Sequence, residues 1–162
     1  MANILLKKSY LLKDLKETSF KDLWDTHGVF TTMWIFEKPV KILFFKKHIK
    51  NLIRSIKIYK INSKNIEKKI LKIIKFNLKK NKKYNHLLRI AVNNKFISFS
   101  LRKRIKLKSK FIVKLIDCKR KEPEFKNLKY KKILKHLSKV DSSSYDIFLC
   151  VNKKILESAT SN

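Results

Sequence analysis

The sequence predicts an α/β protein of the mixed α+β kind, and three observations lead to this prediction. Stretches with the spacing of an amphipathic helix alternate with short stretches of β-branched and aromatic residues. Their order along the chain is strand, two helices, three strands, a linker, one helix and two strands. The chain has 162 residues, 44% of them hydrophobic, so it can bury a sizeable core and corresponds to one domain or slightly more.

The first expected elements are a strand and two helices. The strand covers residues 29–35, which read VFTTMWI after the single glycine, Gly28. Apolar residues then recur at helical spacing over residues 45–59 and again over residues 66–74, with lysines opposite them. Ser63 is the expected N-cap of the second helix.

Three strands are expected next, at residues 87–92, 96–101 and 111–116. The middle one alternates large apolar residues with a phenylalanine and two serines, so one of its faces is expected to be in water. Residues 118–124 are charged and contain Pro123, so they are the expected linker.

The end of the chain is expected to form a helix and two strands. Apolar residues at helical spacing predict the helix over residues 130–140, and Asp141 with three serines ends it. A buried type of strand follows at residues 147–151, and a turn leads into the last strand at residues 155–157.

The charge of the chain first indicates nucleic acid. The net charge is +30, and Lys and Arg side chains neutralise phosphates. However, 37 of the cations are Lys and only 5 are Arg, and Ile and Asn are over-used as well. This composition resembles a coding bias toward A and T more than a recognition patch. The densest basic run, residues 101–108 with Lys110, is interpreted as a solvated loop in preference to a nucleic-acid contact.

Several common sites are excluded or have no support in the sequence. One glycine cannot form a phosphate-binding glycine loop, and the four histidines lack metal-ligand spacing, so no metal is expected. Lysines interrupt every apolar stretch that could span a membrane, and the start of the chain lacks the features of a signal peptide. Cys118 and Cys150 are expected to be reduced thiols of a cytoplasmic protein.

Four segments, in order along the chain, resemble one family. Residues 155–162, ILESATSN, are similar to a V-T-E-G-x-x-S-N segment, and residues 28–32, GVFTT, are similar to a G-x-F-E-T strand. Residues 48–55, HIKNLIRS, are similar to an H-x-x-R-L-x-x-S helix. The stretch from residues 125–130, FKNLKY, to residues 145–149, YDIFL, is similar to the part that begins with a catalytic lysine and ends in a G-Y-D-E-x-L-x strand.

These motifs are those of the fold-type IV pyridoxal-phosphate (PLP) enzymes, which are the class IV aminotransferases. The family includes branched-chain and D-amino-acid aminotransferases and aminodeoxychorismate lyase, and the F-T-T form at residues 30–32 is closest to the lyase. The resemblance implies a small N-terminal α/β domain over residues 1–121. It also implies that residues 122–162 are an incomplete start of the large domain that holds PLP.

The resemblance assigns roles to individual residues. Lys126 would bind PLP as a Schiff base and move the proton at the substrate carbon, which requires a lysine with a depressed pKa. Glu157 would lie against the pyridine nitrogen and keep it protonated, so that the cofactor acts as an electron sink. Tyr130 lies one position from a tyrosine that touches the phenolic oxygen of the cofactor. On the residues alone, these three are a surface lysine, a strand-end acid and a helix-face core residue.

The sequence departs from the family pattern in three respects. Asn51 stands where the family has its phosphate-binding Arg, and a bidentate charged contact is lost. Arg54 lies three residues later on the same helix face and is the candidate replacement. Ser158 replaces the glycine that follows the glutamate. The resemblance also implies a sequence truncated at Asn162, before the loop and helix that cup the phosphate in the family.

Two other functions remain open on the sequence. The chain could be a small basic α/β protein that binds RNA or ribosomes, or a catalytically inactive aminotransferase homologue that serves an interaction. The enzyme hypothesis implies an amino acid or an aminodeoxychorismate-like small molecule as substrate, a homodimer of the full-length protein, and no membrane.

Overall fold

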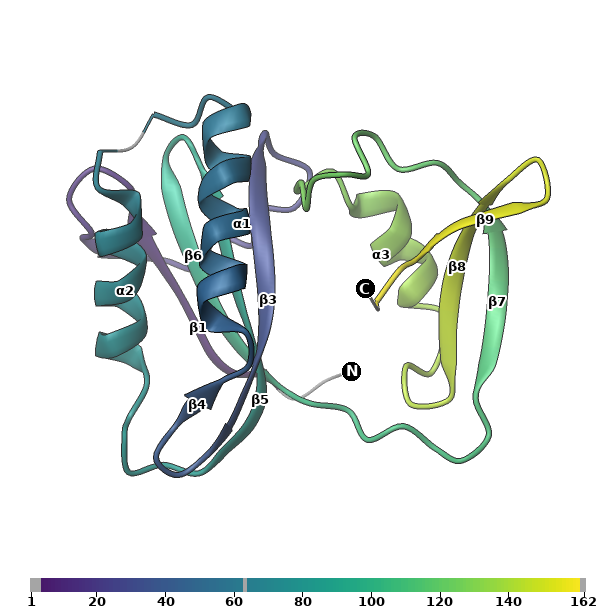
Figure 1. The fold of residues 1–162 in the computed structure, drawn as a ribbon, viewed down its shortest axis with the longest axis horizontal. Helices are drawn as coiled ribbons and strands as arrows, with labels where there is room; N and C mark the ends of the chain where they lie inside the picture. The colour runs from purple at the N-terminus through teal and green to yellow at the C-terminus, as the bar shows by residue number, and fades with distance from the viewer. Residues whose placement is uncertain (1–3, 63, 161–162) are drawn as a thin grey trace. The chain divides into compact units, whose positions relative to one another are not determined.

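A computed structural model describes residues 4–62 and 64–160 (Figure 1). The chain forms two compact units. The first contains the described part of Met1–Arg104 together with Phe125–Leu128, and the second contains Ile105–Glu124 and the described part of Lys129–Asn162. The mixed α+β prediction is confirmed, and each unit is described by itself below.

The first unit is a six-stranded antiparallel sheet with two helices against it (Figure 1). The strands lie in the order β2-β1-β6-β5-β3-β4. The elements of this unit are β1 (Ile4–Leu11), β2 (Glu17–Thr18), β3 (Gly28–Glu37), β4 (Lys41–Ile42), α1 (Phe45–Ile58), α2 (Ile66–Asn77), β5 (Tyr84–Asn93) and β6 (Phe96–Lys103).

The core of this unit lies between the helices and one face of the sheet. Each helix buries its isoleucine and leucine stripe and leaves its lysines in water, as its sequence period predicts. On β3 the side chains alternate between buried and half-buried, so Met33 and Ile35 enter the core while Trp34 lies on the other face. The side chains that meet in the core include Leu52, Ile70, Leu88, Ile90 and Phe99, which are at most 2% exposed.

The expected wet face of β6 is wrong at Ser98, which is 1% exposed. The hydroxyls of Ser98 and Ser9 lie 2.8 Å apart, and the backbone of Lys21 bonds to both. The loop that follows β2 therefore covers this part of the second sheet face, as Leu23 also shows by packing with Ala91 and Leu128. A segment distant in sequence supplies this cover, which the alternation within β6 cannot indicate.

The expected strands and helices of the first unit are found, and the structure adds the strands β1, β2 and β4. The strand β1, which pairs with β6 from Ile4↔Arg102 to Leu11↔Phe96, was not predicted. This strand has two lysines at its centre and apolar residues on both faces, so its sequence lacks the alternation of apolar and polar residues that predicts a strand. The predicted N-cap Ser63 lies outside the described residues, and Asn65, with a left-handed φ of 55°, precedes the first turn of α2.

The second unit is a three-stranded sheet with one helix. Its elements are β7 (Ile112–Asp117), α3 (Lys131–Leu137), β8 (Tyr145–Val151) and β9 (Lys154–Ser158). The parallel pair β7–β8 places α3 in the crossover connection, and β9 returns antiparallel to β8. The small core contains Ile116, Ile133, Ile147, Leu149 and Ala159.

The second unit differs from the sequence prediction in two places. The helix is shorter than predicted, because it ends at Leu137 and Val140 packs onto the core from beyond its end. The domain boundary expected between residues 121 and 122 falls inside this unit, since β7 pairs with β8. Residues 125–128 in turn belong to the first unit, because they pair with β3.

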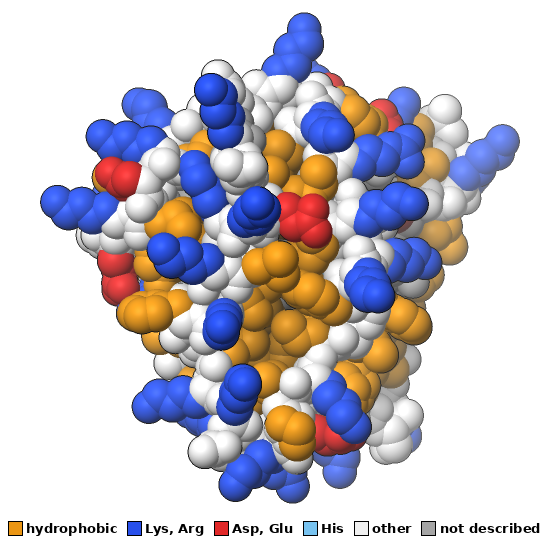
Figure 2. Space-filling model, turned by 60° about the vertical axis from the view of Figure 1, so that its left-hand side comes forward, with side chains coloured by type: hydrophobic (Ala, Val, Ile, Leu, Met, Phe, Trp, Pro, Cys, Tyr) orange, Lys and Arg blue, Asp and Glu red, His pale blue; other side chains and the backbone are white. Residues whose placement is uncertain are grey.

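On the face seen in Figure 2, positive charge is spread out instead of being gathered into one patch. The face seen in Figure 2 carries Lys and Arg side chains over its whole extent, with hydrophobic side chains between them and few acids. The basic residues from Arg102 to Lys110 are all exposed. Arg102 and Lys103 lie at the end of β6, and the basic residues from Arg104 onward lie in the loop that the sequence predicts. No helix in the described ranges 4–62 and 64–160 is long and apolar enough to cross a membrane.

Candidate functional site

The segment that carries Lys126 is held against the start of β3 in the first unit. The backbone amide of Phe30 donates to the carbonyl of Lys126 at 2.7 Å, and the amide of Leu128 donates to the carbonyl of Gly28 at 2.9 Å. Between them, Val29 and Asn127 form an antiparallel bridge. The backbone of Lys126 is therefore fixed by the strand whose GVFTT sequence resembles the family motif, and its side chain is partly exposed.

Gly28 is required because the chain is crowded at this point. A Cβ atom at this position would lie 2.7 Å from Cδ1 of Leu128 and 3.0 Å from Cβ of Asn93, and it would also clash with the carbonyl oxygen of Val92. Gly28 therefore lets β3 approach β5 and the Lys126 segment at the same time.

His48 and Thr31 lie next to this segment, and neither was a candidate site residue. The Thr31 hydroxyl is 3.0 Å from Nδ1 of His48, joining β3 to α1. Burial lowers the pKa of His48, and the positive charges of Lys126 and Lys47 lower it further. The sequence contains a signal for both residues, because they belong to the motifs that resemble the family, although the spacing of the four histidines gives His48 no role as a metal ligand.

Asn51 and Arg54 are both exposed on α1. The buried stripe of this helix consists of Ile49, Leu52 and Ile56, and neither candidate belongs to it. The role of both residues in holding phosphate stays a prediction.

In the second unit, Glu157 is paired with an arginine that the sequence placed in a linker. Nε of Arg120 donates to Oε1 of Glu157 at 2.9 Å, and Nη2 donates to Oε2 at 2.9 Å. The Arg120 side chain is 6% exposed and that of Glu157 is 25% exposed. Two parallel charge-assisted bonds fix the plane of the carboxylate and leave part of it accessible. Arg120 is one of only five arginines, which was the one signal that could have distinguished it.

Tyr130 belongs to the same cluster. Its ring centroid lies 5.5 Å from Cζ of Arg120, and its hydroxyl donates to the carbonyl of Ala159 at 3.2 Å. The pKa of Tyr130 is raised, mainly by burial. The positive charge of Arg120 acts to lower this pKa, and the negative charges of Glu157 and Asp146 act to raise it. The structure thus brings two of the predicted site residues, Tyr130 and Glu157, together around Arg120.

Ser158, which replaces the family glycine, has a partner of its own. Its hydroxyl donates to Oδ2 of Asp146 at 2.7 Å, and the backbone amide of Ile147 donates to Oδ1 at 2.8 Å. Asp146 is 3% exposed, so its carboxylate needs these donors. The bond from Ser158 fastens the end of β9, immediately after Glu157, to β8.

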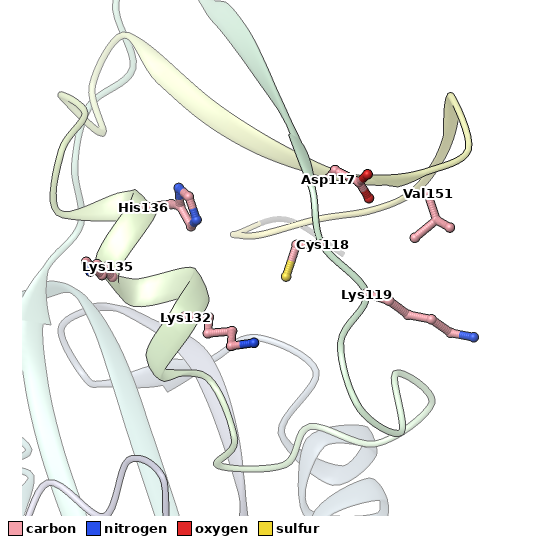
Figure 3. Close-up of a pocket in the computed structure, with 7 residues that line it drawn as sticks. All are labelled: Asp117, Cys118, Lys119, Lys132, Lys135, His136 and Val151. Carbon is pink, nitrogen blue, oxygen red and sulfur yellow. The ribbon is translucent and has the colours of Figure 1, made fainter.

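The same unit contains a basic cavity of about 530 Å³ (Figure 3). Its wall is formed by Asp117, Cys118, Lys119, Lys132, Lys135, His136 and Val151. Lys132 and His136 extend from α3 toward Cys118 (Figure 3). None of the predicted site residues lines it. Within residues 4–62 and 64–160, no group of three His, Cys, Asp or Glu side chains could hold a metal ion.

Two solved structures with the same fold are described as aminotransferases. A hypothetical aminotransferase from Mycobacterium tuberculosis in its PLP-bound form matches with a TM-score of 0.57 and 11% identity, over 95% of this chain and 66% of that one. A branched-chain aminotransferase from the archaeon Thermoproteus uzoniensis with norvaline matches with a TM-score of 0.61 and 14% identity, over 94% of this chain and 62% of that one. This chain therefore spans less than two thirds of the length of either structure.

A search of curated proteins finds no match. The family model described as amino-transferase class IV matches residues 28–162, which include all four motifs, Lys126 and Glu157. Enzymes of this family use PLP as their cofactor. The chain belongs to the class IV aminotransferases.

Proposed function

We propose that this chain is the part of a PLP-dependent class IV enzyme that carries its reactive lysine, Lys126, and the carboxylate for the pyridine nitrogen, Glu157. The family match over residues 28–162 supports the enzyme class. The observation that carries the proposal is the bidentate pair between Arg120 and Glu157. A carboxylate whose plane is fixed in this way, yet which stays partly accessible, suits contact with a protonated ring nitrogen.

The residues fit PLP unequally. Lys126 offers an amine on a backbone fixed by β3, and Glu157 offers a fixed anion. The phosphate end is weaker, because Asn51 offers only a neutral hydrogen bond and Arg54 supplies a cation from an exposed position on α1. We therefore expect the described residues to bind PLP covalently at Lys126 but with low affinity.

Each residue has a separate task in this proposal. The bound cofactor supplies the electron sink, as PLP does in its enzymes. Lys126 holds the cofactor and moves the proton at the substrate carbon, as general base and then as general acid. Glu157 keeps the ring nitrogen protonated, and Tyr130 contacts the phenolic side of the ring. The neutral His48 imidazole lies near Lys126 without adding positive charge to the site.

An amino acid is the proposed substrate class, in line with the family and with the relative that was solved with norvaline. The F-T-T sequence at residues 30–32 keeps the aminodeoxychorismate-lyase type as the second choice. We propose that the full-length protein acts as a homodimer, as the family does.

Covalent trapping tests the proposal. The chain is incubated with PLP and reduced with borohydride, and the modified lysines are mapped by mass spectrometry. We expect dominant labelling at Lys126 and loss of the visible absorbance of bound cofactor in Lys126→Ala. Lys129→Ala is the matched control and should keep both signals.

Diffuse labelling over many lysines would contradict a formed site and would favour the two alternatives. RNA binding that weakens steeply with salt would then support a nucleic-acid role for the exposed run from Arg102 to Lys110. Absence of salt-dependent RNA binding would favour the remaining alternative, a catalytically inactive aminotransferase homologue.

A further inference from the structure

We propose that Arg120 is a positioning residue for the cofactor site, which sets the orientation of Glu157 and the place of Tyr130. This inference rests on the proposed function. It starts from a discrepancy: residues 118–124 read as a solvated linker, but Arg120 is among the buried charged residues of the described chain, at 8% exposure.

The contact with Glu157 is one that only an arginine can make. Both bonds are 2.9 Å long and come from two different nitrogens, Nε and Nη2, so the guanidinium and carboxylate planes are matched side by side. A lysine would supply the charge as a single point and would leave the carboxylate free to rotate. The carboxylate oxygens retain lone pairs, so the pair does not prevent Glu157 from accepting a further hydrogen bond.

Arg120 also connects the other segments of the cluster. Nη2 donates to the carbonyl of Pro123, which fixes the course of the loop. The guanidinium lies over the ring of Tyr130, the residue that precedes α3. One side chain therefore links the loop, the start of α3 and β9, which is where the two predicted cofactor contacts of this unit are found.

The composition of the chain supports a specific need for arginine here. Lysine fills 37 of the 42 cationic positions. A buried, bidentate position is where lysine cannot replace arginine without loss. Removing Glu157 would take the bidentate partner from a buried guanidinium, so the pair is expected to persist in the folded protein.

The test separates charge from geometry. Arg120→Met removes both, Arg120→Lys keeps the charge without the fork, and Arg104→Lys is the matched control, since Arg104 is exposed and its guanidinium lies over Trp34 at 4.3 Å. The first readout is the pKa of the Tyr130 phenol in the absence of cofactor, measured by an NMR titration of the isotopically labelled ring. The charged groups facing that phenol are Arg120, Glu157 and Asp146.

We expect Arg120→Met to raise the pKa of Tyr130, Glu157→Gln to lower it, and Arg120→Lys to leave it near the wild-type value. The second readout is the affinity for PLP, measured by absorbance and by trapping at Lys126. Both Arg120 variants should weaken it by about tenfold or more, in the range found for partners that orient metal ligands. If Arg120→Lys keeps the Tyr130 pKa near the wild-type value but loses affinity for PLP, the geometry of Arg120 and not only its charge positions Glu157.

Three results would overturn the inference, and they differ from one another. Trapping at Lys126 with wild-type affinity in Arg120→Lys and Arg120→Met would refute the role of Arg120 and leave the proposed function intact. An unchanged Tyr130 pKa in Arg120→Met would show that the cluster does not form. Failure of the wild-type chain to trap PLP at Lys126 would refute the proposed function, and the role of Arg120 with it. If Arg120→Met does not fold, Arg120→Lys and Glu157→Gln give the same decisions.

Discussion

The hydroxyl oxygen of Thr31 lies 3.0 Å from Nδ1 of His48, so a buried residue of β3 is tied directly to the first turns of α1. The pKa of His48 is lowered first by burial and then by the charges of Lys126 and Lys47. The imidazole is therefore neutral near pH 7, and one hydrogen bond to Thr31 suits that state. Protonation of His48 at acidic pH would therefore disturb the contact between β3 and α1, next to the segment that carries Lys126.

The first prediction is that the protein loses stability as the pH falls below the ordinary histidine pKa of about 6.5. The folded pKa of His48 is depressed, so below this value the unfolded chain binds more protons than the folded one. The loss therefore begins near the unfolded pKa and ends below the folded one. Urea denaturation at several pH values would show it. His48→Gln should reduce the slope, and an unchanged slope would contradict the buried, neutral ring. His86, whose pKa burial also lowers, contributes separately and is tested with His86→Gln.

The second prediction concerns the effect of the Lys126 charge on the pKa of His48. Because the ammonium of Lys126 lowers the pKa of His48, Lys126→Met should raise that pKa toward its usual value. Burial and Lys47 remain, so the recovery should be partial. A pH titration of the His48 ring signals by NMR measures the effect. Lys129→Met is the control and should leave the signals unchanged, whereas equal shifts in both variants would indicate a general effect of net charge.

The third prediction concerns Gly28. Gly28→Ala should destabilise the protein by about 1–3 kcal/mol, the range for overpacking a crowded site. The added Cβ would meet the side chains of Leu128 and Asn93 as well as the backbone of Val92, and the sheet backbone cannot move away freely. Denaturant midpoints compared with Ser100→Ala, on the partly exposed face of β6, provide the measurement. The control should stay within about 0.5 kcal/mol of the wild type.

The same substitution should also affect the proposed chemistry. Gly28 and Phe30 make the backbone bonds that hold the Lys126 segment, so displacement of this segment should reduce PLP trapping at Lys126. Trapping at the wild-type level in a clearly destabilised Gly28→Ala variant would show that the lysine is positioned without these bonds.

Periodic elements could be predicted from the sequence, and contacts between distant segments could not. The stripes Ile49, Leu52 and Ile56 on α1 and Ile70 and Ile73 on α2 follow the helical period, and the core uses them as such. β1 was missed because Lys7 and Lys8 interrupt its pattern, although pairing with β6 makes it a full strand. Its stability comes from the neighbouring strand and not from its own composition.

The site shows the same division. The family motifs predict Lys126, Glu157 and Tyr130 as site residues, and two of these meet around one residue. That residue, Arg120, was missed because six of the seven residues 118–124 are charged or proline, a composition typical of a linker whatever one of them contacts. Burial of a single long side chain depends on a partner 37 positions later, and local composition carries no information about it.

The fourth prediction concerns Asp141, which ends the segment after α3. Its carboxylate accepts the backbone amide of Ser143 at 3.0 Å, the hydroxyls of Ser143 and Ser144 at 2.8 and 3.0 Å, and the Lys108 ammonium at 3.0 Å. These donors hold the pKa of Asp141 well below the usual aspartate value, and the backbone amide contributes most. Because the folded pKa is depressed, the stability that this group provides is complete above about pH 4 and is lost as the pH falls further.

The backbone bond and the ion pair can be separated by experiment. Lys108→Gln removes the ammonium together with its hydrogen bond to Asp141, so it should raise the pKa of Asp141 by only part of the total shift. Salt at 1 M, which screens charges beyond about 3 Å, should also raise it by only part of the shift. The amide of Ser143 is not screened in this way and should keep the pKa low in both cases. NMR titration of the Asp141 carboxyl carbon gives the values. A return to the ordinary aspartate pKa in Lys108→Gln would mean that the exposed ion pair dominates and that the turn at Ser143 is not formed.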